Sequence, residues 1–271
     1  MLVSALEGNR LELAVEESHL ENSQGREDVF WRGITQKGPD LIITVGTPAT
    51  RSAMAHVRNI PIVFTMVLDN LIDLNSPARN SDVCGVTLAI PVEKQLEMMR
   101  MALPDIRRVG FIYSRGSAQM YQSAKDIANR EGLRLLASEI ASERDIPEIL
   151  RRILPEIDVL WMPPDAVIYE RNILRFILLE CFQNNVPIMA ASRQIAIAGT
   201  PLALGVDYED IGRQTAELAL RRLSGRTFSR SGIQHPRKVV LYINERVVSK
   251  LGINIPQNIV DQAITLQSGS H

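Results

Sequence analysis

Apolar residues in this chain form two kinds of pattern, short continuous runs and longer segments with helical spacing. The clearest run, 41–45, is rich in β-branched residues and stops at Gly46, which is typical of a strand buried on both faces. Thr47 then stands where an N-cap would lie, and Pro48 stands where the first helical residue has no N–H to lose. The sequence therefore predicts a strand followed directly by a helix.

The two patterns alternate along most of the chain. Further strands are predicted at 11–18, 60–67, 83–88, 109–113, 133–137, 159–162, 187–191, 202–206 and 238–243. Helices are predicted at 26–35, 49–57, 91–103, 119–130, 146–154, 173–182 and 245–251, with another that begins at Asp207 or Asp210. Strands separated by helices form parallel sheets, and the pattern restarts after Arg107, so we expect an α/β fold with two such sheets.

Small polar residues follow several of the predicted strands. They are Thr47, Thr65 and Asp69 in the first series and Ser114, Ser117, Asp165 and Ser192 in the second. Open α/β sheets bind ligands at the carboxyl ends of their strands, where hydroxyls and backbone N–H groups hold a solute without transforming it. Two interpretations stay open: Thr47 caps its helix or binds an anionic group, and Asp69 caps a turn or pairs with a ligand ammonium.

Composition narrows the possible functions. The net charge of −1 gives no electrostatic reason to expect nucleic acid or a membrane surface as a partner. No apolar run is long enough to span a bilayer. Cys84 and Cys181 have no metal-ligand spacing; small buried thiols and a disulfide between them are both compatible with the sequence.

Motifs of catalysis and cofactor binding are missing from the sequence. The turn at Gly46 has one glycine where a dinucleotide fingerprint needs three, and there is no GxxxxGK[ST] loop or G-x-S-x-G elbow. The histidines are isolated, so neither a metal nor a cofactor is expected. Asp165 at a strand end could be a catalytic carboxylate, but no partner is visible.

The order of several short motifs resembles a known family. DLIITVGTPA is followed by IPIVFT, by a CGVT turn before a helix, and later by VGFIYS. This order is similar to that of the periplasmic solute-binding proteins of ABC transporters, in the subfamily of tryptophan- and tyrosine-type binding proteins. The resemblance extends from about Asp40 to near the end of the chain.

The resemblance implies two Rossmann-like lobes with parallel sheets and the type I periplasmic-binding-protein architecture. One lobe is expected at 1–87 with 201–232 and the other at 88–200 with 233–271, joined by three hinge crossings. The resemblance supports ligand contacts by Thr47, Ala49, Thr65 and Asp165. Together with the strand-end and turn positions read from the residues themselves, the expected ligand-binding residues are Thr47, Pro48, Ala49, Thr65, Asp69, Ser114, Ser117, Asp165, Ser192 and Asp207. In the periplasm, a small solute such as an amino acid or related carboxylate would bind between the lobes. The protein would then deliver it to an ABC permease in the membrane.

The sequence departs from the family pattern at two places. Residues 1–9 are too few for the expected first strand and helix and contain no export signal, so we expect a truncated first lobe in which an exposed sheet edge could pair between chains. The turn after Tyr113 reads SRGSAQ instead of an asparagine-containing loop, which leaves the solute open. Alternative functions are a ligand-sensing domain of a regulator or receptor, and an enzyme.

Overall fold

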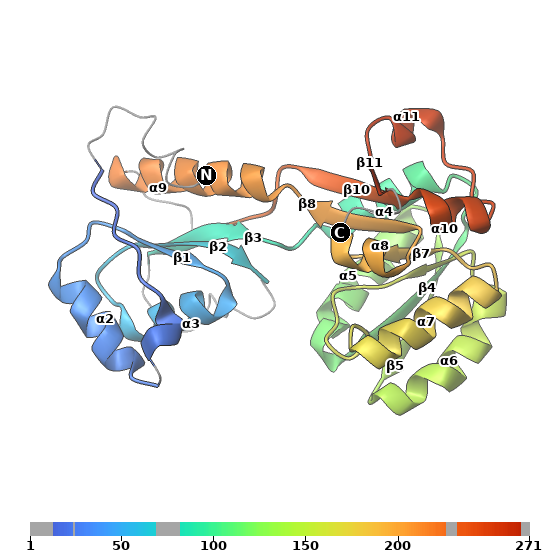
Figure 1. Cartoon of the computed structure of the whole chain (residues 1–271), viewed down its shortest axis with the longest axis horizontal. Coiled ribbons are helices and arrows are strands. Elements are labelled where there is room, and N and C mark those ends of the chain that lie inside the picture. Colours follow the sequence, from blue (N-terminus) through green and yellow to red (C-terminus); the bar gives the residue numbers. More distant parts are fainter. Residues whose placement is uncertain (1–12, 24, 69–81, 226–231, 267–271) are drawn as a thin grey trace. The chain divides into compact units, whose positions relative to one another are not determined.

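The computed structural model describes residues 13–23, 25–68, 82–225 and 232–266. The chain divides into two compact units, residues 1–90 with 206–238 and residues 91–205 with 239–271 (Figure 1). The chain therefore passes between the units three times, after residues 90, 205 and 238.

The first unit is built on a four-stranded parallel sheet in the order β1-β2-β3-β9. Its strands are β1 (Ile42–Val45), β2 (Ile62–Val67), β3 (Val83–Thr87) and β9 (Ile233–Gln234). Its helices are η1 (Leu20–Ser23), α2 (Glu27–Gln36), α3 (Thr47–His56) and α9 (Tyr208–Leu223). Figure 1 shows α9 along one face of this sheet and α2 and α3 on the other. Ile42 packs in the α2–α3 core, whereas Ile43 packs on the α9 side, as the alternation along a strand requires.

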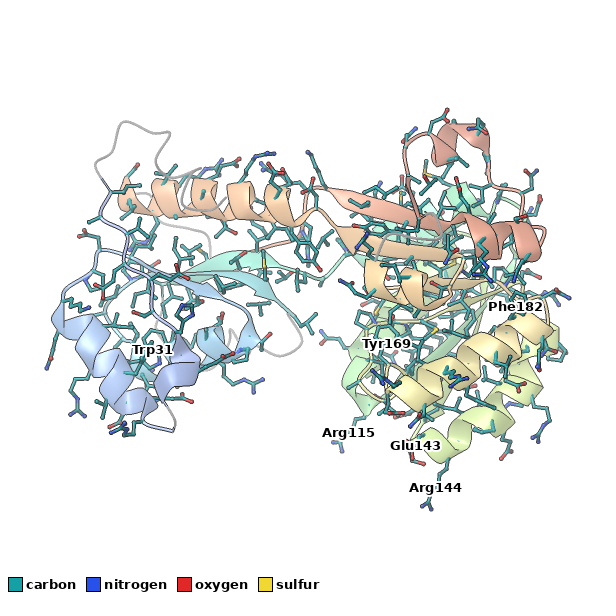
Figure 2. All side chains as sticks on the ribbon, viewed as in Figure 1. Trp31, Arg115, Glu143, Arg144, Tyr169 and Phe182 are labelled. Carbon is teal, nitrogen blue, oxygen red and sulfur yellow. The ribbon has the colours of Figure 1, made fainter. Side chains whose placement is uncertain are left out.

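A buried hydrogen-bond chain joins α2 to α3. Trp31 on α2 (Figure 2) is only 4% exposed. Its indole N–H donates to Ser52 Oγ on α3 at 2.8 Å. The Ser52 hydroxyl in turn donates to the carboxylate of Glu27. An indole N–H has no acceptor function, so burial of Trp31 depends on the Ser52 oxygen.

Replacing Ser52 by alanine is expected to lower the free energy of unfolding by about 1–3 kcal/mol, because the Trp31 N–H would stay buried without an acceptor. Urea denaturation followed by far-UV circular dichroism, which does not depend on the indole, measures the change. The double variant with Trp31→Phe serves as the control, because the serine should matter much less once the indole N–H is absent. Additive effects of the two substitutions would contradict this explanation.

The second unit contains a seven-stranded sheet in the order β11-β10-β8-β7-β6-β4-β5. Its strands are β4 (Arg108–Ser114), β5 (Arg134–Ile140), β6 (Val159–Trp161), β7 (Ile188–Ala190), β8 (Leu202–Val206), β10 (Val239–Asn244) and β11 (Ile264–Leu266). Its α-helices are α4 (Val92–Ala102), α5 (Ala118–Arg130), α6 (Ile146–Ile153), α7 (Arg171–Gln183), α8 (Arg193–Ala198), α10 (Glu245–Lys250) and α11 (Gln257–Val260). Three short 3₁₀ segments are η3 (Arg115–Ser117), η4 (Glu143–Asp145) and η5 (Leu154–Glu156).

Both faces of this sheet are covered by apolar side chains. Leu160 and Ile188 pack in a large core with residues of α6 and α7. On the other face, the Trp161 ring lies 4.8 Å from that of Phe111, and the Trp161 indole N–H donates to Gln95 of α4 at 3.1 Å. Coverage on both faces explains why the central strands read as continuous apolar runs.

The α/β fold with parallel sheets is confirmed, with one antiparallel exception. The backbone N–H of Asn244 donates to Pro201 O, and that of Asp207 donates to Lys238 O. The end of β10 therefore lies beside the start of β8, so these two strands run in opposite directions. The chain can add β10 in this way because α9, between them in sequence, packs in the first unit.

Several sequence predictions differ from the structure. Residues 13–19 form no strand; Leu13 packs instead against Ala216 and Ala219 of α9. The sequence predictions do not include the short elements β9, β11, α8 and α11. The segment 201–205 lies in the second unit, and the segments 88–90 and 233–238 lie in the first, whereas the sequence placed each of them in the other lobe.

Candidate functional site

The carboxyl end of β1 leads into α3 through a glycine. Gly46 is the N-cap residue, with φ 84° and ψ 161°, and its carbonyl accepts the backbone N–H of Thr50 at 3.2 Å. Thr47 is therefore the first helical residue, and the interpretation that it caps α3 is wrong. This backbone conformation is available almost only to glycine, so the turn is fixed by Gly46.

The side chains around the α3 N-terminus are partly open to solvent. Thr47 and Ala49 are half-buried, Pro48 is exposed, and Thr47 Oγ1 accepts the N–H of Leu68 at 3.4 Å. Val45 is 58% exposed and Leu68 is 37% exposed. The first N–H groups of a helix have no intrahelical acceptors, so polar donors and apolar side chains meet here at one strand-end surface.

The end of β2 is irregular. Met66 has φ 55°, which is uncommon for a residue other than glycine, and the pairing with β3 shifts register between Thr65 and Val67. Nothing in the local sequence indicates this left-handed residue. Thr65 is 3% exposed, and its hydroxyl accepts a hydrogen bond from Thr215 of α9 at 2.9 Å. Asp69, also predicted to bind ligand, lies outside the described residues.

In the second unit, three predicted residues form one hydrogen-bonded cluster. Asp165 follows β6, and its carboxylate accepts the backbone N–H of Ser114 at 2.9 Å and the Ser117 hydroxyl. The other carboxylate oxygen accepts the N–H groups of Val167 and Ile168. The carboxyl ends of the neighbouring strands β4 and β6 are thus tied together by one side chain.

The electrostatics of this cluster favour a charged carboxylate. Burial raises the pKa of Asp165, but the hydrogen bonds from Ser117 and Ser114 and the N–H of Val167 together hold that pKa below its usual value. Asp165 is therefore ionised at neutral pH. A catalytic acid would need the opposite shift in pKa.

Ser192 follows the next strand, β7, and caps α8 by accepting the N–H of Ile195 at 3.4 Å. A residue that sequence reasoning missed lies beside it. The Tyr169 hydroxyl donates to Met162 O at 3.2 Å and accepts the N–H of Ala191 at 3.1 Å, which joins the ends of β6 and β7. A lone tyrosine in a loop gives no sequence signal for such a contact.

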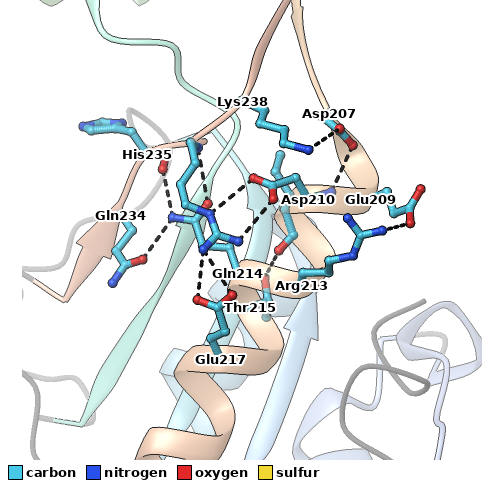
Figure 3. Close-up of polar contacts among 12 residues, drawn as sticks. Asp207, Glu209, Asp210, Arg213, Gln214, Thr215, Glu217, Gln234, His235 and Lys238 are labelled. Carbon is cyan, nitrogen blue, oxygen red and sulfur yellow. Dashed lines mark hydrogen bonds and ion pairs between the residues drawn. The ribbon is translucent and has the colours of Figure 1, made fainter. Parts of the chain in front are cut away.

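Asp207, the last predicted ligand residue, caps α9 in the first unit. Its carboxylate accepts the N–H of Asp210 at 3.0 Å and lies 3.8 Å from the Lys238 ammonium (Figure 3). Further along α9, the Gln214 side-chain amide donates to Gln234 and to the carbonyl of His235, both at 3.0 Å. These contacts hold the segment 234–238, which leads out of the first unit, against α9.

A groove of about 480 Å³ lies elsewhere on the second unit. Its lining residues are Glu93, Glu97, Arg100, Met101, Pro104 and Glu131. Pro104 precedes β4, so the groove is near the amino ends of the strands and away from the predicted residues. Within the described part of the chain, no group of acidic, cysteine and histidine side chains could hold a metal ion. Both cysteines are free. None of the described helices has the length and apolar character required to cross a bilayer.

The comparisons with known proteins agree with this fold. A family model described as ABC transporter substrate binding protein matches residues 8–266. A tyrosine-binding protein of Clostridioides difficile is 25% identical over 220 residues, which are 78% of this chain and 63% of that protein. The chain thus spans less than two thirds of the length of this relative.

Solved structures show the same architecture. The ligand-free, open structure of a substrate-binding protein with adhesive properties from Clostridium difficile is 22% identical, with a TM-score of 0.81 over 99% of this chain and 93% of that one. A domain from Streptococcus pneumonia in complex with L-Trp is 20% identical, with a TM-score of 0.64 over 98% and 93%. The type I periplasmic-binding-protein fold and the expected family are therefore confirmed, and this chain belongs to the ABC transporter substrate-binding proteins.

Proposed function

We propose that this chain captures a small solute, an amino acid or a related carboxylate, and delivers it to an ABC permease on the outer side of the cytoplasmic membrane. The first turn of α3 carries the proposal. It presents the Thr47 hydroxyl, helix N-terminal amides and the positive end of the helix dipole, which suit a partly negative oxygen of the solute. The family description names substrate binding, an activity that requires such groups and no catalytic residue.

The surroundings of this turn suit a solute with an apolar part. Val45 and Leu68 remain exposed beside Thr47, although most aliphatic side chains of this unit are buried. Ligand sites combine a largely apolar lining with a few polar groups that fix orientation. The tyrosine-binding relative and the L-Trp complex support an amino acid with a large side chain.

Each unit contributes strand-end groups to binding under this proposal. Thr47, Pro48 and Ala49 contact the solute from the first unit, and Ser114 and Ser192 from the second. Thr65 and Ser117 are buried as well as hydrogen-bonded, and the Asp207 carboxylate caps α9, so we assign these three residues supporting contacts. Among the described residues β1 is an edge strand, so pairing between chains stays a prediction, which light scattering over a range of concentrations tests.

Native mass spectrometry of the purified protein is the first experiment, because a tightly held solute survives purification. Thermal unfolding with L-tyrosine, L-tryptophan, glucose and ribose follows. A ligand at a hundred times its Kd adds about 2.7 kcal/mol to the free energy of unfolding, so binding raises Tm measurably. Stabilisation by sugars and not by amino acids would overturn the proposal.

Replacing Thr47 by valine is expected to weaken L-tyrosine binding about tenfold, which corresponds to about 1.4 kcal/mol. Valine keeps the shape of threonine but lacks its hydroxyl, and the bond that Thr47 accepts from Leu68 is long, so Tm should change little. Isothermal titration calorimetry measures the affinity. Thr35→Val, which removes a hydroxyl from the exposed surface of α2, is the matched control. Equal affinities of both variants would contradict a role for Thr47.

A further inference from the structure

Asp165 uses its whole hydrogen-bonding capacity inside the protein. One carboxylate oxygen accepts from Ser114 N and Ser117 Oγ, and the other from the N–H groups of Val167 at 3.0 Å and Ile168 at 3.4 Å. The side chain is 6% exposed. A carboxylate offers about four lone-pair sites, so four donors leave none for a solute ammonium.

The segment that Asp165 holds is the 3₁₀ turn Arg115–Ser117. Ser114 caps this turn by accepting the N–H of Gly116 at 3.2 Å, so the turn is fixed at both ends. Its exposed residues are Arg115 and Gly116. The turn lies at the carboxyl end of β4, where α/β sheets bind their ligands.

Arg115 is a cation without a partner in the described part of the chain. Neither an ion pair nor a side-chain hydrogen bond engages its guanidinium there. Figure 2 shows its side chain extending outward from the second unit, on the same side as Glu143 and Arg144, which follow the neighbouring strand β5. A guanidinium offers five donors in a planar fork that matches a carboxylate.

We propose that Arg115 binds the carboxylate of the solute, and that Asp165 is a positioning residue that fixes the Arg115–Ser117 turn without touching the solute. This inference rests on the proposed function and names the residue that selects an anionic solute. The alternative is that the Asp165 carboxylate contacts a solute ammonium directly. The two roles predict different effects of substituting Asp165.

The chain offers a matched control for Asp165. Asp158 joins the amino ends of the same two strands: its carboxylate accepts the N–H groups of Arg107 and Arg108, both at 2.8 Å, and pairs with the Arg108 guanidinium. Asp158→Asn and Asp165→Asn both remove a charged link between β4 and β6. They do so at opposite edges of the sheet, so only Asp165→Asn should disturb the binding turn.

The test measures the affinities of L-tyrosine and of 3-(4-hydroxyphenyl)propionate, which has the same carboxylate and ring but no amine. Asp165→Asn is expected to weaken both at least tenfold, because an amide nitrogen cannot accept the hydrogen bonds that hold the turn. Asp158→Asn should leave both affinities within twofold of the wild type. Loss of L-tyrosine binding alone in Asp165→Asn would show direct contact with the ammonium and overturn the positioning role.

Ser117→Ala gives a milder test if Asp165→Asn folds poorly. It removes one tether from the turn at a side chain that is 6% exposed, and we expect a three- to tenfold loss for both probes. In the double variant with Asp165→Asn the losses should not add, because both substitutions break the same link. Wild-type affinity of Ser117→Ala would contradict the positioning role.

Arg115→Gln is expected to weaken both probes at least tenfold with little change in Tm. Arg144→Gln removes the same charge from the same edge, one strand away, and should stay within twofold of the wild type. Equal losses of affinity in the two variants would show that any positive charge at this edge has the same effect. That result would overturn the role of Arg115.

Hydrogen exchange separates this inference from the proposed function. In Asp165→Asn, and not in Asp158→Asn, the backbone N–H groups of Ser114 and Val167 should exchange faster in the absence of any solute. Unchanged exchange would overturn the positioning role whatever binds. If the wild type binds neither probe but exchange changes as expected, the Arg115 assignment and the proposed amino-acid function both fail, while the link through Asp165 stands.

Discussion

Gly85→Ala is expected to lower the free energy of unfolding of the first unit by at least about 3 kcal/mol. A Cβ at this position would lie 2.1 Å from the backbone oxygen of Phe64 and 2.5 Å from its ring. Gly85 is in β3, between β2 and β9, so neither the carbonyl nor the strand can move without breaking the sheet. Phe64 is itself only 1% exposed and packs in the buried core between the sheet, α2 and α3, so a displaced ring would disturb that core.

Guanidinium denaturation followed by circular dichroism measures the loss. Gly33→Ala is the control, since a Cβ on this residue of α2 would meet no atom within 4 Å. Alanine in a helix interior is favoured over glycine, so this control should gain up to about 1 kcal/mol. A Gly85→Ala variant as stable as the wild type would show that the paired strands β2 and β3 can accommodate a Cβ opposite Phe64.

Gly46→Ala should affect both stability and solute binding. At φ 84° and ψ 161°, a side chain is expected to cost about 1–3 kcal/mol, and relief of the strain would rotate the first turn of α3. That turn carries Thr47 and the helix amides of the proposed binding surface. We therefore expect at least a tenfold loss of L-tyrosine affinity by calorimetry, accompanied by a lower Tm.

Gly38→Ala separates the two effects. Gly38 also has a positive φ, 65°, and a Cβ there would meet no atom within 4 Å, but it precedes β1 and so lies at the amino edge of the sheet. Its substitution should cost about 1–2 kcal/mol and leave affinity unchanged. If Gly46→Ala is destabilised but binds L-tyrosine with wild-type affinity, the first turn of α3 is not part of the binding site.

Much of the fold could be predicted because its signals are local. The apolar runs that became β1, β2 and β4 lie within two residues of their predicted bounds, and Gly46 and Pro48 marked the start of α3. The order of short motifs identified the family. Each of these signals depends only on residues that are close in the sequence, so it can be read without the tertiary structure.

The candidate site was only partly predictable for the opposite reason. The sequence placed Asp165, Ser114 and Ser117 at strand ends, which is where they lie. It could not indicate that the Asp165 carboxylate accepts hydrogen bonds from Ser114 and Ser117, which lie 51 and 48 residues away in the sequence. Nor could it indicate that Thr65 turns toward Thr215, 150 residues later, instead of toward solvent.

The sequence by itself thus determined where strands and helices form, that most strands are parallel, and which small polar residues end them. Tertiary structure alone decided that β8 and β10 run in opposite directions, that residues 13–19 pack on α9 without forming a strand, and that Asp165 has no free lone pair. Periodicity records which face of an element is apolar. The identity of the hydrogen-bond partner depends on long-range packing, which no local pattern encodes.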